Sequence, residues 1–427
     1  MNFANFFKLL VPVILLTGCA SSKKNFSVQT KPDTIFLRGL LKQNPAFNNI
    51  FLHNDEYRVQ IIYTRINRDK KNMPSFQDFT FNNNKEIYYY PASTVKLPIA
   101  LLALQKLKEL NIKGLDKNTT MITDSAFAEG QQIFNDATSA DGRPTVAQYI
   151  KRILLVSDND ACNRLYEFLG QEYINNKLHK MGYNYTQIIH RLDISLTEEQ
   201  NRTTNPVKFY DNTGKLIYEK PLQKSNLVYA QRNDFLGKGY FSNNVLKMEP
   251  FNFSKKNRLV LADLHSIVKS ILFPSSVAKN QQFDITEEDR LFVQKYMSML
   301  PRESNYPYYD PAIYADDHVK LLFYGSQGSM AEPNIRIFNK EGDAYGFLID
   351  GAYIVDYKNN IEFLLSAVIH CNSDGIYNDD HYDYQETGFP FMKNLGRAIH
   401  QYELNRKRKN RPNLSAIHFN YTQHDED

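Results

Sequence analysis

The stretch "PASTVKLP" at residues 91–98 places Ser93 and Lys96 three positions apart, directly before the apolar run "IALLALQKL". Residues at this spacing share one face of a helix. A serine hydroxyl is a weak nucleophile until a base takes its proton, and a lysine destabilised by burial or by nearby cations can be that base. The pair predicts a lysine-activated serine. Alone, however, such a pair occurs by chance in most chains of this size, and a serine helix cap followed by a surface lysine is the favoured interpretation.

Two further short motifs occur in an order that gives the pair more weight. "SDN" at residues 157–159 interrupts the helical pattern of residues 144–170, and "KEG" at residues 340–342 follows the strand-like stretch "IRIFN". The trio S-x-x-K, S-D-N and K-T-G is a known catalytic set, and here only its last member is imperfect. The first motif lies at a helix start, the second at a break between helices and the third on a strand. These are the contexts in which the three motifs would come together in the fold.

The three motifs together resemble those of the penicillin-recognising serine hydrolases, and most of all the class A β-lactamases. The likeness extends over roughly residues 57–404, apart from 206–256. It implies that Asp158 holds the 157–159 turn and that the backbone N–H groups of Ser93 and Asp343 form an oxyanion hole. It also implies a role for each side chain. Ser93 would be the nucleophile, Lys96 its base or proton relay, and Ser157 the proton donor to the leaving nitrogen. Asn159 would bind the substrate amide, and Lys340 would supply a positive field for Ser157 and for a substrate carboxylate.

The segment "HRLDISLTEEQNRTTNP" at residues 190–206 resembles the loop that carries the deacylating glutamate of class A enzymes. Arg191 and Asp193 fall where the arginine and glutamate of that loop would lie. Asp193 is one methylene shorter than a glutamate, and a base that does not reach its water deacylates slowly. A plain surface loop with a solvated Asp193 is the alternative, and Glu198 or Glu199 could substitute without any motif to support them.

A second departure from the family pattern is Glu341, which replaces the threonine or serine expected between Lys340 and Gly342. If its side chain faces the cleft, it removes a hydroxyl donor and repels a substrate carboxylate. It could instead pair with Lys340 or another cation and face away.

The sequence therefore predicts an exported serine hydrolase with an acyl–Ser93 intermediate and β-lactam amide hydrolysis as its activity, an activity that would confer antibiotic resistance. The alternatives are an esterase, a peptidoglycan-directed acyl-serine hydrolase, and a catalytically weak envelope lipoprotein that keeps the scaffold for binding. No Cys/His spacing indicates a metal site, and no cofactor is expected. The expected partner is a small-molecule or peptide acyl substrate, and the protein is expected to be a monomer. The net charge of +4 is too small to indicate nucleic acid.

The first residues predict export. A single Lys8, an apolar stretch and the sequence "LTGC" form a signal that is too short to span a membrane and resembles a bacterial lipobox. We expect residues 1–18 to be a signal peptide, Cys19 to be lipidated, and residues 19–32 to be a polar tether. An ordinary cleaved signal with an accidental cysteine is the alternative. The expected location is the bacterial cell envelope, facing the periplasm or the exterior.

The remaining chain predicts an α+β fold of the β-lactamase/transpeptidase type. Strand patterns at residues 57–67 and 335–370 indicate an antiparallel sheet built from N- and C-terminal segments, with an all-helical lobe inserted between them. One domain is expected over residues 33–404, with an insertion at about 206–256 and a basic, solvated tail at 405–427. Cys162 and Cys371 could form a disulfide, although buried free thiols are at least as compatible with the pattern.

Overall fold

The computed structural model describes residues 34–125 and 132–421. The predicted signal peptide, Cys19 and the whole predicted tether lie outside these ranges. Within them, no helix combines the length and apolar character that crossing a bilayer would require.

A five-stranded antiparallel sheet joins the two ends of the chain, in the order β12-β13-β14-β1-β2. β1 pairs with β14, which is some 300 residues away in the sequence, with Ile62 opposite Ser366. β13 and β14 are buried along their whole length because both faces of the sheet are covered. The strands are β1 (Gln60–Arg68), β2 (Pro74–Phe81), β12 (Ile335–Ala344), β13 (Phe347–Asp356) and β14 (Ile361–His370). This arrangement confirms the predicted fold class.

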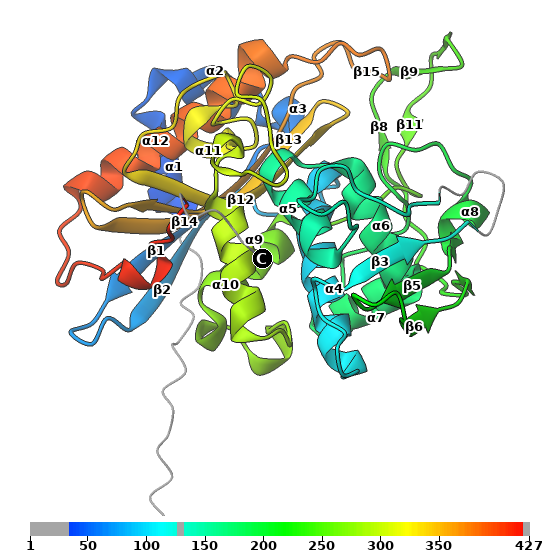
Figure 1. The fold of residues 1–427 in the computed structure, drawn as a ribbon. Coiled ribbons are helices and arrows are strands. Elements are labelled where there is room, and N and C mark those ends of the chain that lie inside the picture. The colour runs from blue at the N-terminus through cyan, green and yellow to red at the C-terminus, as the bar shows by residue number, and fades with distance from the viewer. Residues whose placement is uncertain (1–33, 126–131, 422–427) are drawn as a thin grey trace, which may run out of the picture.

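Helices cover both faces of this sheet, as Figure 1 shows. On one face, α1 and α12 contribute Leu37 and Leu395 to a core with the sheet. On the other face, α9 packs against β1, β13 and β14, and a second core continues into the lobe. The bounds of the sheet-covering helices are α1 (Thr34–Lys42), α2 (Asn48–Leu52), α3 (Asn54–Tyr57), α9 (Leu261–Leu272), α11 (Leu321–Tyr324) and α12 (Phe389–Asn405).

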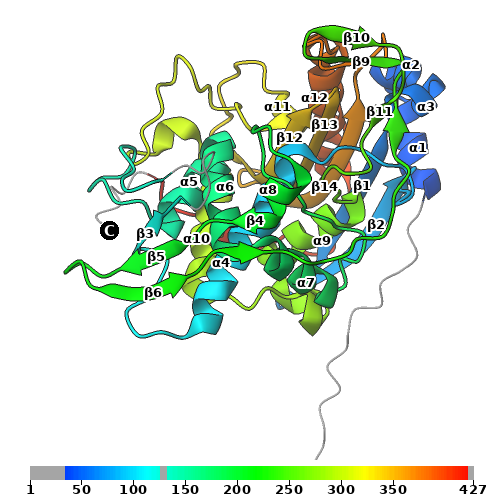
Figure 2. The same cartoon turned by 90° about the vertical axis from the view of Figure 1, so that its right-hand side faces the viewer.

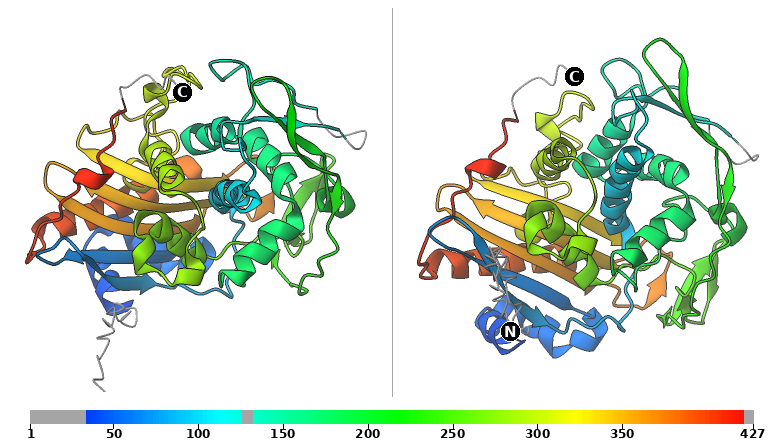
Figure 3. Two further views of the ribbon diagram at one scale, coloured as in Figure 1. Left: turned by 60° about the horizontal axis from the view of Figure 1, so that its bottom comes forward. Right: turned by 90° about the horizontal axis from the view of Figure 1, so that it is seen from below.

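The inserted lobe is built around α4, which is buried along residues 96–107. Thr145 caps the start of α5 by accepting a hydrogen bond from the Gln148 amide, and Ser157, in the left-handed conformation, ends it. Neighbouring helices surround α4, as seen from below in Figure 3. The lobe helices are α4 (Lys96–Leu110), α5 (Val146–Val156), α6 (Asn159–Leu169), α7 (Gln171–Lys180), α8 (Glu198–Arg202) and α10 (Glu287–Ser298).

The prediction of an all-helical lobe is wrong for one part of it. Residues 203–252 form short strands along the outer side of the lobe, visible in Figure 2. Together with β3 and β15, which lie outside this range, these strands make four small sheets: β3-β5-β6, β4-β7, β8-β11 and β10-β9-β15. Their bounds are β3 (Thr120–Thr123), β4 (Thr203–Thr204), β5 (Val207–Tyr210), β6 (Leu216–Lys220), β7 (Gln223–Lys224), β8 (Phe235–Leu236), β9 (Gly239–Ser242), β10 (Val245–Lys247), β11 (Phe251–Asn252) and β15 (Ile376–Tyr377).

The basic segment after α12 differs from the solvated tail that the sequence predicts. Arg406 and Arg408 both form ion pairs with the buried Glu403. Further along, Leu414 is buried and the ring of Tyr421 packs against the guanidinium of Arg336. Residues 406–421 therefore continue the folded domain, because the buried carboxylate and the apolar contacts hold them against it.

Candidate active site

Ser93 lies on a tight turn directly before α4. The sequence pattern suggests a helix opening at Thr94, but Ala92–Val95 form a single 3₁₀ turn, and α4 begins at Lys96. Thr94 donates a hydrogen bond from Oγ1 to the carbonyl of Pro91 at 2.6 Å. Ala92 has a φ of +47°, a left-handed conformation that is uncommon for alanine. Strained backbone of this kind tends to occur at functional sites, and here it is adjacent to the candidate nucleophile.

Lys96 is fully buried, with its ammonium directed at Ser157. Its Nζ lies 3.3 Å from Ser157 Oγ and also donates to the Ser157 carbonyl. Burial, followed by the nearby charge of Lys340, lowers the pKa of Lys96 to about 8. At pH 7 about a tenth of such a lysine is neutral, so it can accept a proton.

The 157–159 turn is held by its own side chains and by an arginine. Ser157 has a φ of +62°, and Asp158 caps α6 by accepting a hydrogen bond from the Ala161 amide at 2.9 Å. Arg152 forms an ion pair with Asp158 at 2.9 Å and another with the buried Asp136, also at 2.9 Å. These contacts fix the direction in which Ser157 and Asn159 project.

The third motif lies on β12, the edge strand that faces the lobe. Lys340 donates from Nζ to Ser157 Oγ at 2.8 Å, so both lysines converge on one hydroxyl. Gly342 lies against the Ser93 turn, where a Cβ would be 2.8 Å from the Ser93 amide nitrogen and 2.9 Å from the Pro91 carbonyl oxygen. Only glycine permits this approach without displacing backbone. Asp343 follows at an exposed position of the strand.

Glu341 faces the site. Its Oε1 accepts a hydrogen bond from Lys340 Nζ at 2.8 Å, and its side chain is 5% exposed. Burial acts to raise the pKa of this carboxyl, but the charge of Lys340 and hydrogen bonds from Lys340 and Ser157 outweigh it and hold the pKa below its usual value. Glu341 is therefore ionised at neutral pH and pairs inside the site, which decides between the two orientations left open by the sequence.

The loop after residue 190 brings Asp193 to the same place. Asp193 is exposed, has a φ of +53°, and lies with Oδ2 3.4 Å from Asn159 Nδ2. Asn163 fixes the neighbouring Leu192 with two hydrogen bonds at 2.9 Å, one to its carbonyl and one from its amide. Asp193 thus borders the site beside Asn159.

The same loop is anchored by a buried ion pair that sequence reasoning did not identify. Arg191 donates from Nε to Glu167 Oε1 at 2.7 Å, and both side chains are 3% exposed. Glu167 also accepts the Asn205 amide at 2.7 Å, while Arg191 reaches the Gln200 and Thr203 carbonyls. The detectable signal was Glu167 itself, a carboxylate within the apolar pattern "CNRLYEFL", where burial requires a cationic partner.

A second unidentified network supports β12 from beneath. Lys320 donates to Asn339 at 2.8 Å, and Asn339 donates to Asp350 at 2.9 Å. Burial lowers the pKa of Lys320 to about 8 and raises that of Asp350 to about 7. Asp350 is paired in register with Glu341, so this network fixes the strand segment that carries the motif.

The 206–256 insertion borders one side of the site through aromatic contacts. Tyr345, in the turn after β12, packs edge-on against Tyr90 at 5.0 Å and against Phe253 of the insertion at 5.3 Å. A separate cavity of about 900 Å³ lies between the insertion and the loop and includes His190 and Lys256 in its lining. Ser93, Lys96, Ser157 and Lys340 do not line it.

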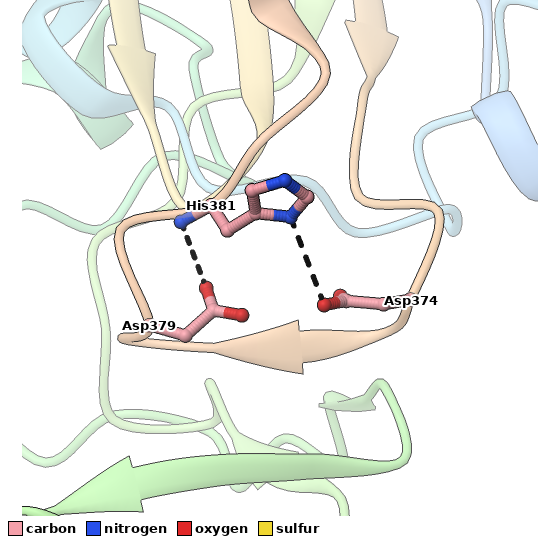
Figure 4. Close-up of side chains that lie close together, drawn as sticks. All are labelled: Asp374, Asp379 and His381. Carbon is pink, nitrogen blue, oxygen red and sulfur yellow. Dashed lines mark hydrogen bonds and ion pairs between the residues drawn. The ribbon is translucent and has the colours of Figure 1, made fainter.

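Neither cysteine forms a disulfide: Cys162 and Cys371 are both buried free thiols. Among the described residues, one group has metal-ligand chemistry, Asp374, Asp379 and His381, with one potential ligand atom from each within 4.8 Å of the others. His381 Nδ1 lies 3.9 Å from Asp374 Oδ2, and the His381 amide donates to Asp379 Oδ1 at 3.1 Å. Figure 4 shows the three side chains on one loop around β15. Exposed carboxylates commonly cluster without an ion, and we do not assign a metal site here.

Comparisons with known proteins bear on this arrangement. Solved structures similar in arrangement include a β-lactamase from Sphaerobacter thermophilus (12% identity, 86% of this chain and 96% of that one, TM-score 0.44) and PBP-A (13%, 88% and 98%, 0.46). An ancestral class A β-lactamase has 12% identity over 86% and 99% of the chains, with a TM-score of 0.45. Likeness at this level says nothing of activity.

A comparison with curated proteins gives no match. Residues 45–227 do match the sequence profile of the β-lactamase enzyme family, and this segment contains the S-x-x-K and S-D-N motifs and the loop with Asp193. The β12 motif lies beyond the matched segment but meets it at Ser157. Residues 45–227 of the chain are therefore β-lactamase-like, as the motifs in this segment predict.

Proposed function

We propose that the protein is a serine hydrolase that forms an acyl–Ser93 intermediate and hydrolyses β-lactam amide bonds. One observation supports this most directly: Lys96 and Lys340 both contact the Ser157 hydroxyl, while Gly342 brings β12 against the backbone of Ser93. Three segments far apart in the sequence thus supply a nucleophile, a buried base and a proton carrier at one place.

In the proposed acylation, Lys96 takes the Ser93 hydroxyl proton as Oγ attacks the carbonyl carbon. The carbon–nitrogen bond then breaks, and Ser157 passes a proton to the leaving nitrogen, with Lys96 restoring the Ser157 proton. Asn159 would bind the substrate amide, and the N–H groups of Ser93 and Asp343 would stabilise the oxyanion. Water attack on the ester, with Asp193 as the base, releases the acid and regenerates Ser93.

The test uses the purified full chain in detergent. Prolonged incubation with a fluorescent penicillin and with p-nitrophenyl acetate reports acylation, and a chromogenic cephalosporin reports turnover. We expect a label that Ser93→Ala removes without changing the circular dichroism spectrum. A label that survives Ser93→Ala would exclude Ser93 as nucleophile. Complete inertness toward all three reagents would instead favour a non-catalytic binding lipoprotein.

An ester or a cell-wall peptide is the second candidate substrate, because the exposed Asp193 and the buried Glu341 both depart from the family pattern. An activity on p-nitrophenyl acetate that exceeds the activity on the cephalosporin would favour it.

We also propose that the protein is anchored in the bacterial envelope by a lipid on Cys19, as a monomer that meets its acyl substrate there. The support is the sequence "LTGC" after an apolar stretch. Metabolic labelling with an alkyne fatty acid tests this: the native chain should take up the label and Cys19→Ala should not.

A further inference from the structure

The ammonium of Lys340 has no hydrogen-bond donor left to offer. Its Nζ donates to Ser157 Oγ at 2.8 Å, to Glu341 Oε1 at 2.8 Å and to the Glu341 carbonyl oxygen at 3.0 Å. A lysine ammonium carries three N–H donors, and these contacts use all of them. Lys340 is thus saturated by groups of the protein.

Lys96, the other cation in the site, is directed at Ser157. Its Nζ donates to the carbonyl and the hydroxyl of Ser157, and the side chain is fully buried. A substrate anion that entered the site would therefore find no free donor on Lys340, and Lys96 is buried against Ser157.

The charges next to these lysines are carboxylates. Glu341 lies against Lys340 and Ser157 with only 5% of its side chain exposed. Asp343 is two positions further along the strand and Asp193 lies beside Asn159, and both of these are exposed. A substrate carboxylate placed against β12 would share one ammonium with Glu341, and like charges at such short range repel strongly in a partly buried site.

We propose that the part of the acyl substrate that lies against Lys340 and Glu341 is uncharged, and that Glu341 makes the site reject a carboxylate there. This rests on the proposed acyl–Ser93 function and narrows its substrate class to neutral acyl donors, namely esters and amides with no carboxylate beside the scissile bond. Glu341 is in this account a residue that determines specificity, and its hydrogen bond also orients Ser157.

The test compares one β-lactam in two forms, a cephalosporin with its free carboxylate and the methyl ester of the same compound. The second-order rate constant for acylation of Ser93 is measured for each by mass spectrometry of the quenched full chain. For the native protein we expect the ester to react at least tenfold faster than the acid, because only the acid meets the charge of Glu341.

Two variants then isolate the charge. Glu341→Gln keeps the side-chain shape and its acceptor oxygen, and Glu341→Thr introduces a small hydroxyl. Both should lower the ester-to-acid ratio by at least tenfold. Glu56→Gln, which removes an exposed carboxylate of α3, is the matched control and should leave the ratio unchanged.

The outcomes separate the two proposals. If Ser93 is acylated but the native protein prefers the acid, or if Glu341→Gln leaves the ratio unchanged, the inference about Glu341 is wrong while the hydrolase function stands. If neither form acylates Ser93, the proposed function fails and this inference fails with it. If the Glu341 variants do not fold, the ester-to-acid ratio of the native protein alone decides whether the site rejects a carboxylate.

Discussion

The buried Arg191–Glu167 pair gives the sharpest prediction about stability. Glu167→Gln would remove the negative charge and leave the Arg191 guanidinium 97% buried beside a neutral amide. Breaking a buried pair by removing one partner costs about 3–5 kcal/mol, because the remaining charge is desolvated without compensation. The loop from Arg191 to Asn205 would lose its anchor at both ends, since Glu167 also accepts the Asn205 amide.

The same loop provides a matched control. Glu198 pairs with Arg202 at 3.1 Å and with Lys255 at 2.9 Å, but its side chain is 54% exposed. Exposed pairs contribute about 0–1 kcal/mol, so Glu198→Gln should be nearly neutral. Equilibrium urea unfolding of the full chain, followed by circular dichroism, measures both free energies of unfolding. If the two variants differ by less than about 1 kcal/mol, the argument from burial is refuted.

The remaining predictions concern catalysis. The single-turnover acylation rate should rise as pH increases through about 8, because the neutral form of Lys96 is the base and its pKa is lowered to that value; a rate that falls over this interval would contradict the assignment. Gly342→Ala should slow acylation at least tenfold with an unchanged circular dichroism spectrum, because its Cβ would lie 2.8 Å from the Ser93 amide nitrogen; a native rate would show that this approach is unimportant. Ser157→Ala should slow acylation by about a hundredfold or more, since proton transfer is lost; stopped-flow rates within threefold of native would exclude that role.

Much of the fold was predictable because its signals are local and long. The alternating and apolar runs of residues 335–370 became β12, β13 and β14, with the turn at 357–360 where the sequence places "YKNN". The helical pattern of residues 144–170, interrupted at "SDN", was equally clear and became α5 and α6. These elements depend on burial patterns of ten or more residues, which sequence alone displays.

The insertion was not predictable in this way. Its strands are two to five residues long, too short for a period to emerge, and β9 pairs with β15, which is more than 130 residues later. The basic cluster at 405–411 is solvated only in part, for a related reason. Arg406 and Arg408 pair with Glu403, a carboxylate buried by the tertiary fold, and nothing local indicates that burial.

For the site, the motifs predicted which residues could meet, while the structure adds what each one contacts. The spacing of "KEG" could not show where Glu341 points, because the direction of a side chain on an edge strand depends on what packs against it. Its pairing with Lys340 comes from the three-dimensional arrangement. Likewise, Glu167 and Asp350 act through partners that are distant in sequence.

The most direct test of the central claim is to locate the covalent bond itself. The full chain is incubated with a neutral β-lactam ester, quenched with acid, digested and mapped by tandem mass spectrometry. Our account predicts a single acyl adduct on Ser93 that accumulates more slowly in Lys96→Met, a variant without a titratable base. An adduct on another residue, or one that forms at the native rate without the lysine, would contradict it.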